Sequence, residues 1–243
     1  MVAHVQTAVA DDGINGASSG FISTISKAWG ANLTAGNFGY LWVWAGINSL
    51  DDSGRWVISD TQGNGWIRQQ SDSETSFSPG PSTGSTQCLF ICRKLIGGAT
   101  TVTITFPSPL RSYARLCMGE FSGVYQLGPT TLDYNFHASV VGTDTVTMPT
   151  VSCRQEDMIV SCVQNLTGSS RYLVGTGYSN FNRTVNDGYA ACETKQSVAI
   201  TTDTPKFSLD LGPGQDYGMS FTLEATHLAS DTPRPIMGRG ATW

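Results

Sequence analysis

The amino-acid sequence predicts an all-β fold, an antiparallel β-sandwich with extended terminal arms. Short runs of β-branched or aromatic residues repeatedly precede clusters of Gly, Asn, Asp or Pro, which is typical of antiparallel strands and their turns. Polar and apolar residues alternate strictly over residues 101–106, and no long amphipathic helical pattern competes with these runs. The chain has 243 residues, of which 40% are hydrophobic, so it can bury a sizeable core as one sandwich.

The first expected strands begin at residue 40. Aromatic and aliphatic residues alternate over residues 40–47, so both faces of this strand are apolar and it should be central. Residues 55–59 and 66–70 form a predicted β-hairpin, because the connecting residues 60–65 contain the Gly and Asn that tight turns favour. Residues 71–86 are rich in Ser, Gly and Pro and are expected to form a surface loop that holds no ladder.

The remaining strands and the turns between them suit two packed sheets. These strands are expected at residues 87–94, 100–106, 113–124, 145–148, 158–164, 172–175, 189–193, 198–201 and 218–225. The chain then divides into an N-terminal segment, residues 1–37, that packs on or extends from the sandwich, the sandwich itself at residues 38–227, and an extended C-terminal arm at residues 228–243.

The C-terminal arm differs in composition from the rest of the chain. It contains Arg234, Arg239 and Trp243, and no acidic residue follows Asp231. One hypothesis is an assembly arm that docks on an acidic surface of a neighbour. The other is a frayed tail, because chain ends are commonly disordered.

Composition excludes several classes of function. Charged residues are 14% of the chain, against about 25% in an ordinary domain, as in virion proteins, extracellular modules and lectin-like folds. A net charge of -5 without any basic run argues against binding to nucleic acid. No stretch approaches about 18 apolar residues, so we expect no membrane span. The first residues lack the basic and apolar regions of a secretory signal, so we expect synthesis in a cytoplasm.

The cysteines are expected to be buried free thiols. Cys88 and Cys92 share a face of one extended segment about 13 Å apart, too far for a disulfide. The other four are scattered without the Cys-x-x-Cys spacing of zinc or redox sites: Cys117, Cys153, Cys162 and Cys192.

Three segments together carry a resemblance to a known group of proteins. In order and spacing, residues 58–66, 97–106 and 119–124 resemble jelly-roll modules, often called lectin-like, of tailed-phage virion proteins and bacterial surface proteins. The resemblance spans roughly residues 38–225 and implies a jelly-roll-like β-sandwich that serves as a decoration, fibre or adhesion element.

Candidate catalytic residues are few. Gly16, Ser18 and Gly20 fit the Gly-x-Ser-x-Gly nucleophile elbow, with His137 and His227 downstream as conceivable bases. The elbow needs a strand before the serine and a helix after it, whereas here an acidic turn precedes it and strands follow. The motif is therefore interpreted as accidental.

Glu120 is the one acidic residue that suggests sugar chemistry, which requires two carboxylates facing a substrate. It is in phase with Leu116 and Met118, so it should be partly buried, where its pKa could rise. The alternative is a structural carboxylate satisfied by an arginine or by backbone amides.

Metal and sugar sites have weaker signals. Residues 51–54 or 60–64 could form a calcium loop, but Asp and Asn also favour turns, and His4 has no partner at ligand spacing. We therefore expect neither a metal nor a cofactor. Sugar binding would need exposed aromatic platforms, and the aromatic residues near loops are Trp66, Tyr125, Tyr134, Tyr172, Tyr178 and Phe181.

The first hypothesis is a structural virion protein of a tailed phage, a capsid decoration or tail appendage subunit, that is not an enzyme. Its partners would be other virion proteins and further copies of itself in a homo-oligomer, and it would be made in the host cytoplasm and reside in the virion. The second hypothesis is a carbohydrate-binding adhesion module at the extracellular surface that binds a host-surface glycan. The third and weakest is a jelly-roll carbohydrate-active enzyme.

Overall fold

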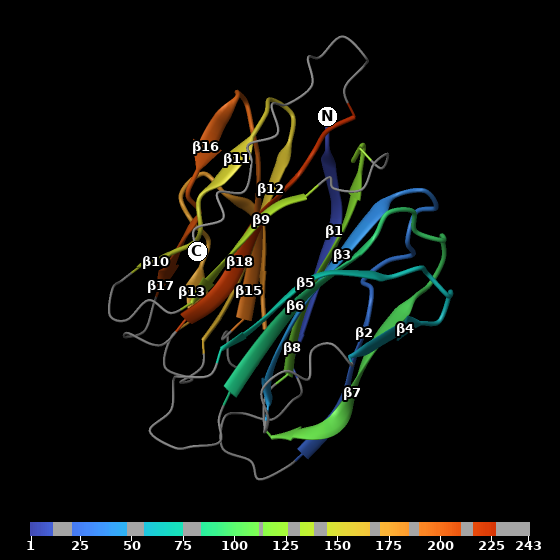
Figure 1. Cartoon of the computed structure of the whole chain (residues 1–243). Helices are drawn as coiled ribbons and strands as arrows, with labels where there is room; N and C mark the ends of the chain where they lie inside the picture. The colour runs from blue at the N-terminus through green and yellow to red at the C-terminus, as the bar shows by residue number, and fades with distance from the viewer. Residues whose placement is uncertain are drawn as a thin grey trace, which may run out of the picture.

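The fold was analysed in a computed structural model. It describes residues 1–11, 21–47, 56–74, 84–111, 114–125, 132–138, 145–165, 171–184, 190–209 and 216–226. All regular structure in these ranges is β, with antiparallel pairing and no helix, which confirms the predicted fold class (Figure 1). None of the described segments forms a helix that could cross a membrane.

The first part of the chain forms two facing sheets, which we call the first sandwich. Its strands are β1 (Ala3–Asp11), β2 (Phe21–Ala28), β3 (Phe38–Ile47), β4 (Val57–Asp60), β5 (Ile67–Glu74), β6 (Gly84–Cys92), β7 (Thr101–Arg111) and β8 (Ala114–Ser122). The order is β1-β8-β3-β6-β5 in the first inner sheet and β2-β7-β4 in the first outer sheet. Residues 1–37, expected to pack on or extend from a sandwich, thus contribute an integral strand to each sheet.

The rest of the described chain forms a second sandwich. Its strands are β9 (Leu132–Ala138), β10 (Thr145–Thr147), β11 (Val151–Cys153), β12 (Met158–Asn165), β13 (Tyr172–Leu173), β14 (Ser179–Arg183), β15 (Ala190–Gln196), β16 (Thr201–Asp203), β17 (Lys206–Leu209) and β18 (Asp216–Leu223). The second inner sheet has the order β14-β15-β12-β18-β9, the second outer sheet β10-β17-β13, and β11 pairs with β16 as a separate two-stranded ribbon. The structure therefore has two sandwiches where we expected one.

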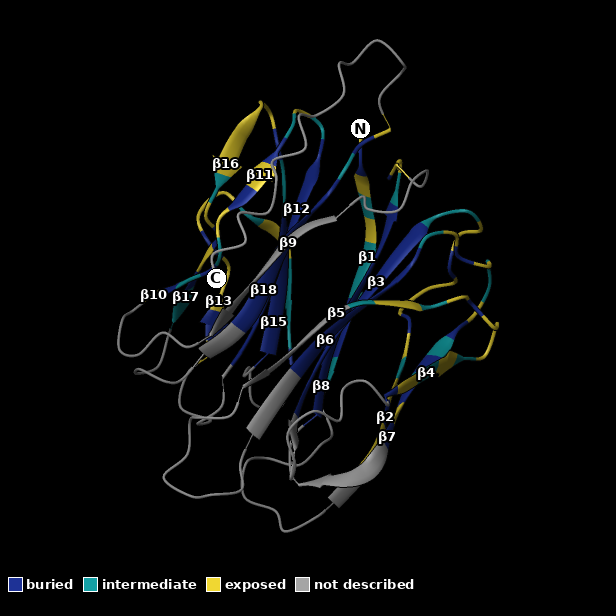
Figure 2. Cartoon of the chain, in the orientation of Figure 1, coloured by how far each residue is buried: buried dark blue, intermediate teal, exposed yellow. Residues whose placement is uncertain are grey.

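The two sandwiches share one apolar core between their inner sheets. Trp42 and Phe121 of the first inner sheet belong to the same buried cluster as Cys162 and Phe221 of the second. The rings of Tyr40 and Phe221 meet edge to face across this core, with centroids 5.2 Å apart. Figure 2 shows that buried residues concentrate in these inner sheets, whereas much of β4 and β16 is exposed.

A separate apolar layer lies beneath each outer sheet. Leu41 and Val43 of β3 pack in one buried cluster with Ile104 of β7, while Tyr172 and Phe207 form part of another under the second outer sheet. Alternate residues of β3 thus face two different cores. This confirms the prediction that residues 40–47 form a central strand with two apolar faces.

The predicted hairpin of residues 55–59 and 66–70 is wrong. β4 pairs with β7 in the outer sheet and β5 pairs with β6 in the inner sheet, so residues 60–65 cross between sheets. The carboxylate of Asp60 holds this crossover: it accepts the backbone N–H groups of Gln62 and Asn64 at 2.9 and 3.1 Å and the indole N–H of Trp66 at 2.6 Å.

Two other local predictions need correction. Residues 71–86 were expected to form a loop without a ladder, but β5 and β6 pair from Ser71 opposite Cys88 to Glu74 opposite Ser85. Residues 75–83 lie outside the described part of the chain. The strand expected at residues 198–201 begins only at Thr201, because the residues before it form a bend.

All six cysteines are buried free thiols, as predicted. Cys88 and Cys92 belong to the same apolar cluster, which fits their predicted common face. Burial raises the pKa of the Cys88 thiol to about 12, an effect that the nearby positive charge of Arg68 opposes. This thiol is therefore protonated at neutral pH and a weak nucleophile.

Candidate functional site

Glu120 is a structural carboxylate. It lies on β8 with 0% of its surface exposed. Its Oε1 accepts the backbone N–H of Thr34 at 2.8 Å and the side-chain amide of Asn37 at 2.7 Å, and its Oε2 accepts the side-chain amide of Gln6 at 2.6 Å. The carboxylate therefore links β1 and the connection into β3 to β8. One donor is a backbone amide, as expected for a structural carboxylate, and the two others are side-chain amides in place of the expected arginine.

Several candidate residues lie outside the part of the chain that the structure describes. They are the motif at residues 16–20, the acidic turn at residues 51–54, His227, and the arm residues Arg234, Arg239 and Trp243. His137 lies on β9, but its side chain is also outside the described part. His4 is half-buried beside the Phe121 ring, with centroids 5.6 Å apart, and burial lowers its pKa, which favours a neutral imidazole.

Most of the expected aromatic platforms are occupied within the fold. Trp66 donates its indole N–H to Asp60, Tyr172 is fully buried, and Phe181 packs on an apolar cluster. Tyr134 has no described side chain. Tyr125 remains, with 37% of its surface exposed.

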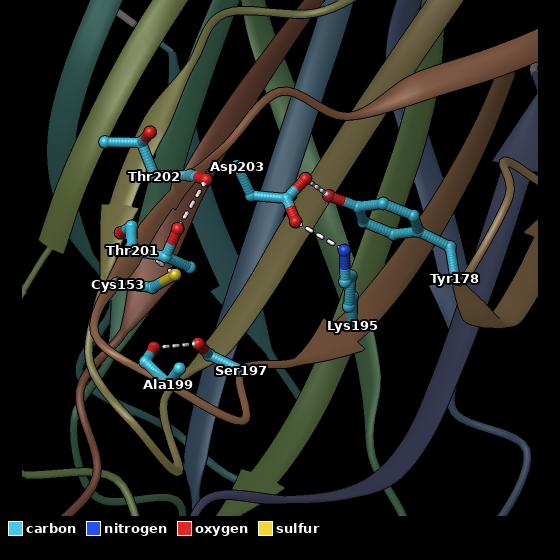
Figure 3. A network of polar contacts seen from close by, with 8 residues as sticks. All are labelled: Cys153, Tyr178, Lys195, Ser197, Ala199, Thr201, Thr202 and Asp203. Atoms are coloured by element: carbon cyan, nitrogen blue, oxygen red, sulfur yellow. Dashed lines mark hydrogen bonds and ion pairs between the residues drawn. The ribbon is translucent and has the colours of Figure 1, made fainter.

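A polar network, missed by the sequence analysis, joins the β11–β16 ribbon to the second inner sheet (Figure 3). Asp203 of β16 accepts the hydroxyl of Tyr178 at 2.8 Å and the ammonium of Lys195 at 2.5 Å. The ammonium also lies 5.4 Å from the centre of the Tyr178 ring. Burial and the acceptor Asp203 hold the pKa of Tyr178 well above its ordinary value, so its hydroxyl remains a donor.

Glu193 lies beside this network on β15. It is fully buried, and its Oε2 accepts the backbone N–H of Gly175 at 2.7 Å. Its Oε1 has no hydrogen-bond partner among the described residues. Burial raises the pKa of Glu193 to about 8; the hydrogen bond from Gly175 opposes this rise, and the negative charge of Asp203 adds to it. The carboxyl is therefore mainly neutral at pH 7.

The contacts of Asp203 attach the β11–β16 ribbon to the second inner sheet. Both oxygens of Asp203 are engaged, one by Tyr178 and one by Lys195, so the ribbon is fixed to the sheet through both. Within the described ranges, no three His, Cys, Asp or Glu side chains are grouped so that they could hold a metal ion. We therefore define Tyr178, Lys195 and Asp203 as the ribbon latch.

An exposed apolar pair lies just before the β11–β16 ribbon. Val198 and Ile200, in the bend that leads into β16, are 85% and 84% exposed, the highest values among the large hydrophobic residues described. Thr201 and Thr202, which follow them, are also exposed. These two exposed apolar side chains, two residues apart, form a candidate contact site.

Comparisons with known proteins add no relatives. A scan against protein-family models found no match, and neither did a search of curated proteins or of solved structures. The function is therefore inferred from the chain's own residues.

Proposed function

We propose that this protein is a structural virion protein of a tailed phage, a capsid decoration or tail appendage subunit, that acts through protein–protein assembly. The observation that carries the proposal is the exposed pair Val198 and Ile200 in the bend that leads into the β11–β16 ribbon. Burying such a side chain in a contact contributes about 1.5 to 3 kcal/mol. In the isolated chain both side chains stay exposed and gain little of this burial free energy. They would gain it on binding a partner surface.

The state of the acidic residues supports assembly over catalysis. Glu120, the strongest candidate for sugar chemistry, is held by three amides, and Asp203 has both oxygens engaged. Glu193 has a raised pKa but is fully buried. A general acid must reach the proton acceptor of a substrate, so none of these carboxyls is well placed for that role.

The strand order supports the proposed jelly-roll character of each sandwich. In a jelly roll, strands numbered along the chain place the eighth between the first and third, and the seventh beside the second. The orders β1-β8-β3-β6 and β2-β7-β4 follow this scheme. β5 departs from it, because it pairs with β6 in the inner sheet.

The test is incorporation into a purified virion. Quantitative mass spectrometry of particles from the native source should find the wild-type chain at a fixed stoichiometry. A double variant, Val198→Lys with Ile200→Lys, should fold normally because both side chains are exposed, yet lose at least about tenfold in occupancy. Ile96→Lys is the matched control, since Ile96 is also an exposed apolar residue, at 48%, and lies in the first sandwich on the connection after β6. Incorporation of the double variant at the wild-type level would refute the role of the ribbon, and absence of the wild-type chain from particles would refute the proposed function.

A second candidate, a carbohydrate-binding adhesion module, is favoured by Tyr125. Its ring is partly exposed, and its backbone N–H donates to the carbonyl of Glu224 at 2.8 Å, which fixes its position. On a glycan array, the isolated protein should then bind a glycan and lose that binding on Tyr125→Ala. An array without signal would remove this candidate.

A further inference from the structure

We propose that the chain consists of two copies of one eight-stranded repeat, residues 1–125 and 132–226, which pack on each other as a tethered homodimer. The first evidence is the strand order. The two inner sheets have the same strand order, because β1-β8-β3-β6-β5 matches β9-β18-β12-β15-β14 strand for strand. The two outer sheets also match, β2-β7-β4 with β10-β17-β13. All eight strands of the first sandwich have a counterpart.

The turn that precedes the third strand of each repeat has the same hydrogen bonds. Gly36 donates its backbone N–H to the carbonyl of Leu95 at 2.9 Å, and Leu95 donates its own N–H to the carbonyl of Asn37 at 2.8 Å. In the second repeat, Glu156 donates its backbone N–H to the carbonyl of Ser197, and Ser197 donates its own N–H to the carbonyl of Asp157, both at 2.8 Å. Gly36 and Glu156 both have a positive φ, 88° and 72°, although the left-handed region is uncommon for a residue other than glycine.

The turn before the fifth strand of each repeat has a similar sequence. Residues 63–66 read Gly-Asn-Gly-Trp and residues 175–178 read Gly-Thr-Gly-Tyr. The aromatic residue of each turn donates to an aspartate, although the two aspartates differ in position: Trp66 donates to Asp60 at the end of β4 at 2.6 Å, and Tyr178 donates to Asp203 of β16 at 2.8 Å. In both repeats, the strand that follows shifts its register against its partner within a few residues of this turn.

The β11–β16 ribbon is the longer form of a contact that the first repeat also has. Trp29 donates its backbone N–H to Thr100, and Met148 donates to Pro205, in each repeat from the residue after the second strand to the residue before the seventh. Between this bond and the positive-φ turn, the first repeat has the isolated antiparallel bridge of Leu33 and Gly98, and the second repeat has the paired strands β11 and β16. The ribbon therefore extends a bridge that is common to both repeats.

The contact between the two repeats is reciprocal. Val124 and Ala225, which follow the last strand of each repeat, form an antiparallel bridge. Tyr125 donates to Glu224 at 2.8 Å, and Thr226 donates to Gly123 at 2.9 Å. If Val124 corresponds to Ala225, each of these bonds is the image of the other, as in an isologous two-fold interface. The partner that the first inner sheet fits is therefore a second copy of its own repeat.

The proposal predicts that the order of the repeats can be reversed. A circular permutant of the full chain would begin at residue 126, run to Trp243 and continue through Met1 to Tyr125, so that residues 227–243 connect the two repeats. The connection is feasible because Thr226 is bonded to Gly123, which also packs against the backbone of Met1. The control permutant uses the same connection but begins at Gly63, which divides the first repeat between the two ends.

The permutant cut between the repeats should fold, with a thermal midpoint within about 4 °C of the wild type. The control should melt at a clearly lower temperature. A between-repeat permutant that melts at or below the control, or that fails to fold, overturns the proposal.

A second measurement leaves the order of the chain unchanged. A protease site inserted within residues 126–131 is cleaved after folding. The two fragments should stay together in size-exclusion chromatography and regain native tryptophan fluorescence after unfolding in urea and refolding. Fragments that separate on the column contradict a tethered homodimer.

Discussion

Glu193 should make the protein less stable as the pH rises from 6 to 9. Burial raises its pKa from the ordinary 4.5 to about 8, so the folded state keeps a proton that the unfolded state releases. The stability that this group contributes is complete below pH 4.5 and is lost as the pH rises through 8. Each pH unit inside that window removes about 1.4 kcal/mol, so the loss between pH 6 and pH 9 is about 2 to 3 kcal/mol.

The variant Glu193→Gln tests this effect. Glutamine keeps an oxygen that can accept the Gly175 N–H, but it does not titrate. Urea unfolding followed by tryptophan fluorescence at pH 6, 7, 8 and 9 gives the free energy of unfolding of each protein. Between pH 6 and pH 9, the free energy of unfolding of the variant should rise relative to that of the wild type by about 2 to 3 kcal/mol.

The matched control is Glu224→Gln, which removes a half-buried carboxylate just after β18. Its difference from the wild type should stay constant across the same pH values. The reasoning fails if the Glu193→Gln difference is equally constant, because the carboxyl would then titrate alike in the folded and unfolded states.

Three further outcomes follow from the same structure. Glu120→Ala should lower the free energy of unfolding by about 3 kcal/mol, because three part-buried hydrogen bonds to its carboxylate are lost; urea unfolding with a loss below about 1 kcal/mol would contradict this. Gly175→Ala should destabilise strongly, because a Cβ there collides with the carbonyl of Lys206, whereas Gly177→Ala meets open space and should cost about 1 kcal/mol for its positive φ; equal thermal midpoints would refute the contrast. Ellman's reagent should react with none of the six thiols in the folded protein and with all six in urea, and rapid reaction in the folded state would disprove their burial.

Local pattern was sufficient for the class of fold and for its central strand. The alternation of aromatic and aliphatic residues over 40–47 needs two apolar environments, and the structure provides one on each side of β3. The predicted hairpin failed because turn chemistry is ambiguous. A glycine with positive φ, such as Gly63, suits a hairpin and a crossover equally. The choice depends on where Trp66 packs, which is a long-range contact.

The ribbon latch could not be predicted from spacing, because its members meet only through the fold. Tyr178 lies 25 residues from Asp203 along the chain, and Lys195 lies 8 residues from it, on β15 in a different sheet. The repeated Gly-x-Gly-aromatic pattern at residues 63–66 and 175–178 was the available signal. Two such short matches gain meaning only when the strand orders around them are known to agree.

The apolar cluster between the inner sheets bears on how the chain comes apart. Tyr40 and Phe221 belong to different sandwiches but bury each other. Unfolding of one sandwich alone would expose the aromatic rings of the other to water. Partly unfolded states are therefore high in free energy. Although chains of this size often populate intermediates, heating should reveal a single cooperative transition whose calorimetric and van't Hoff enthalpies coincide.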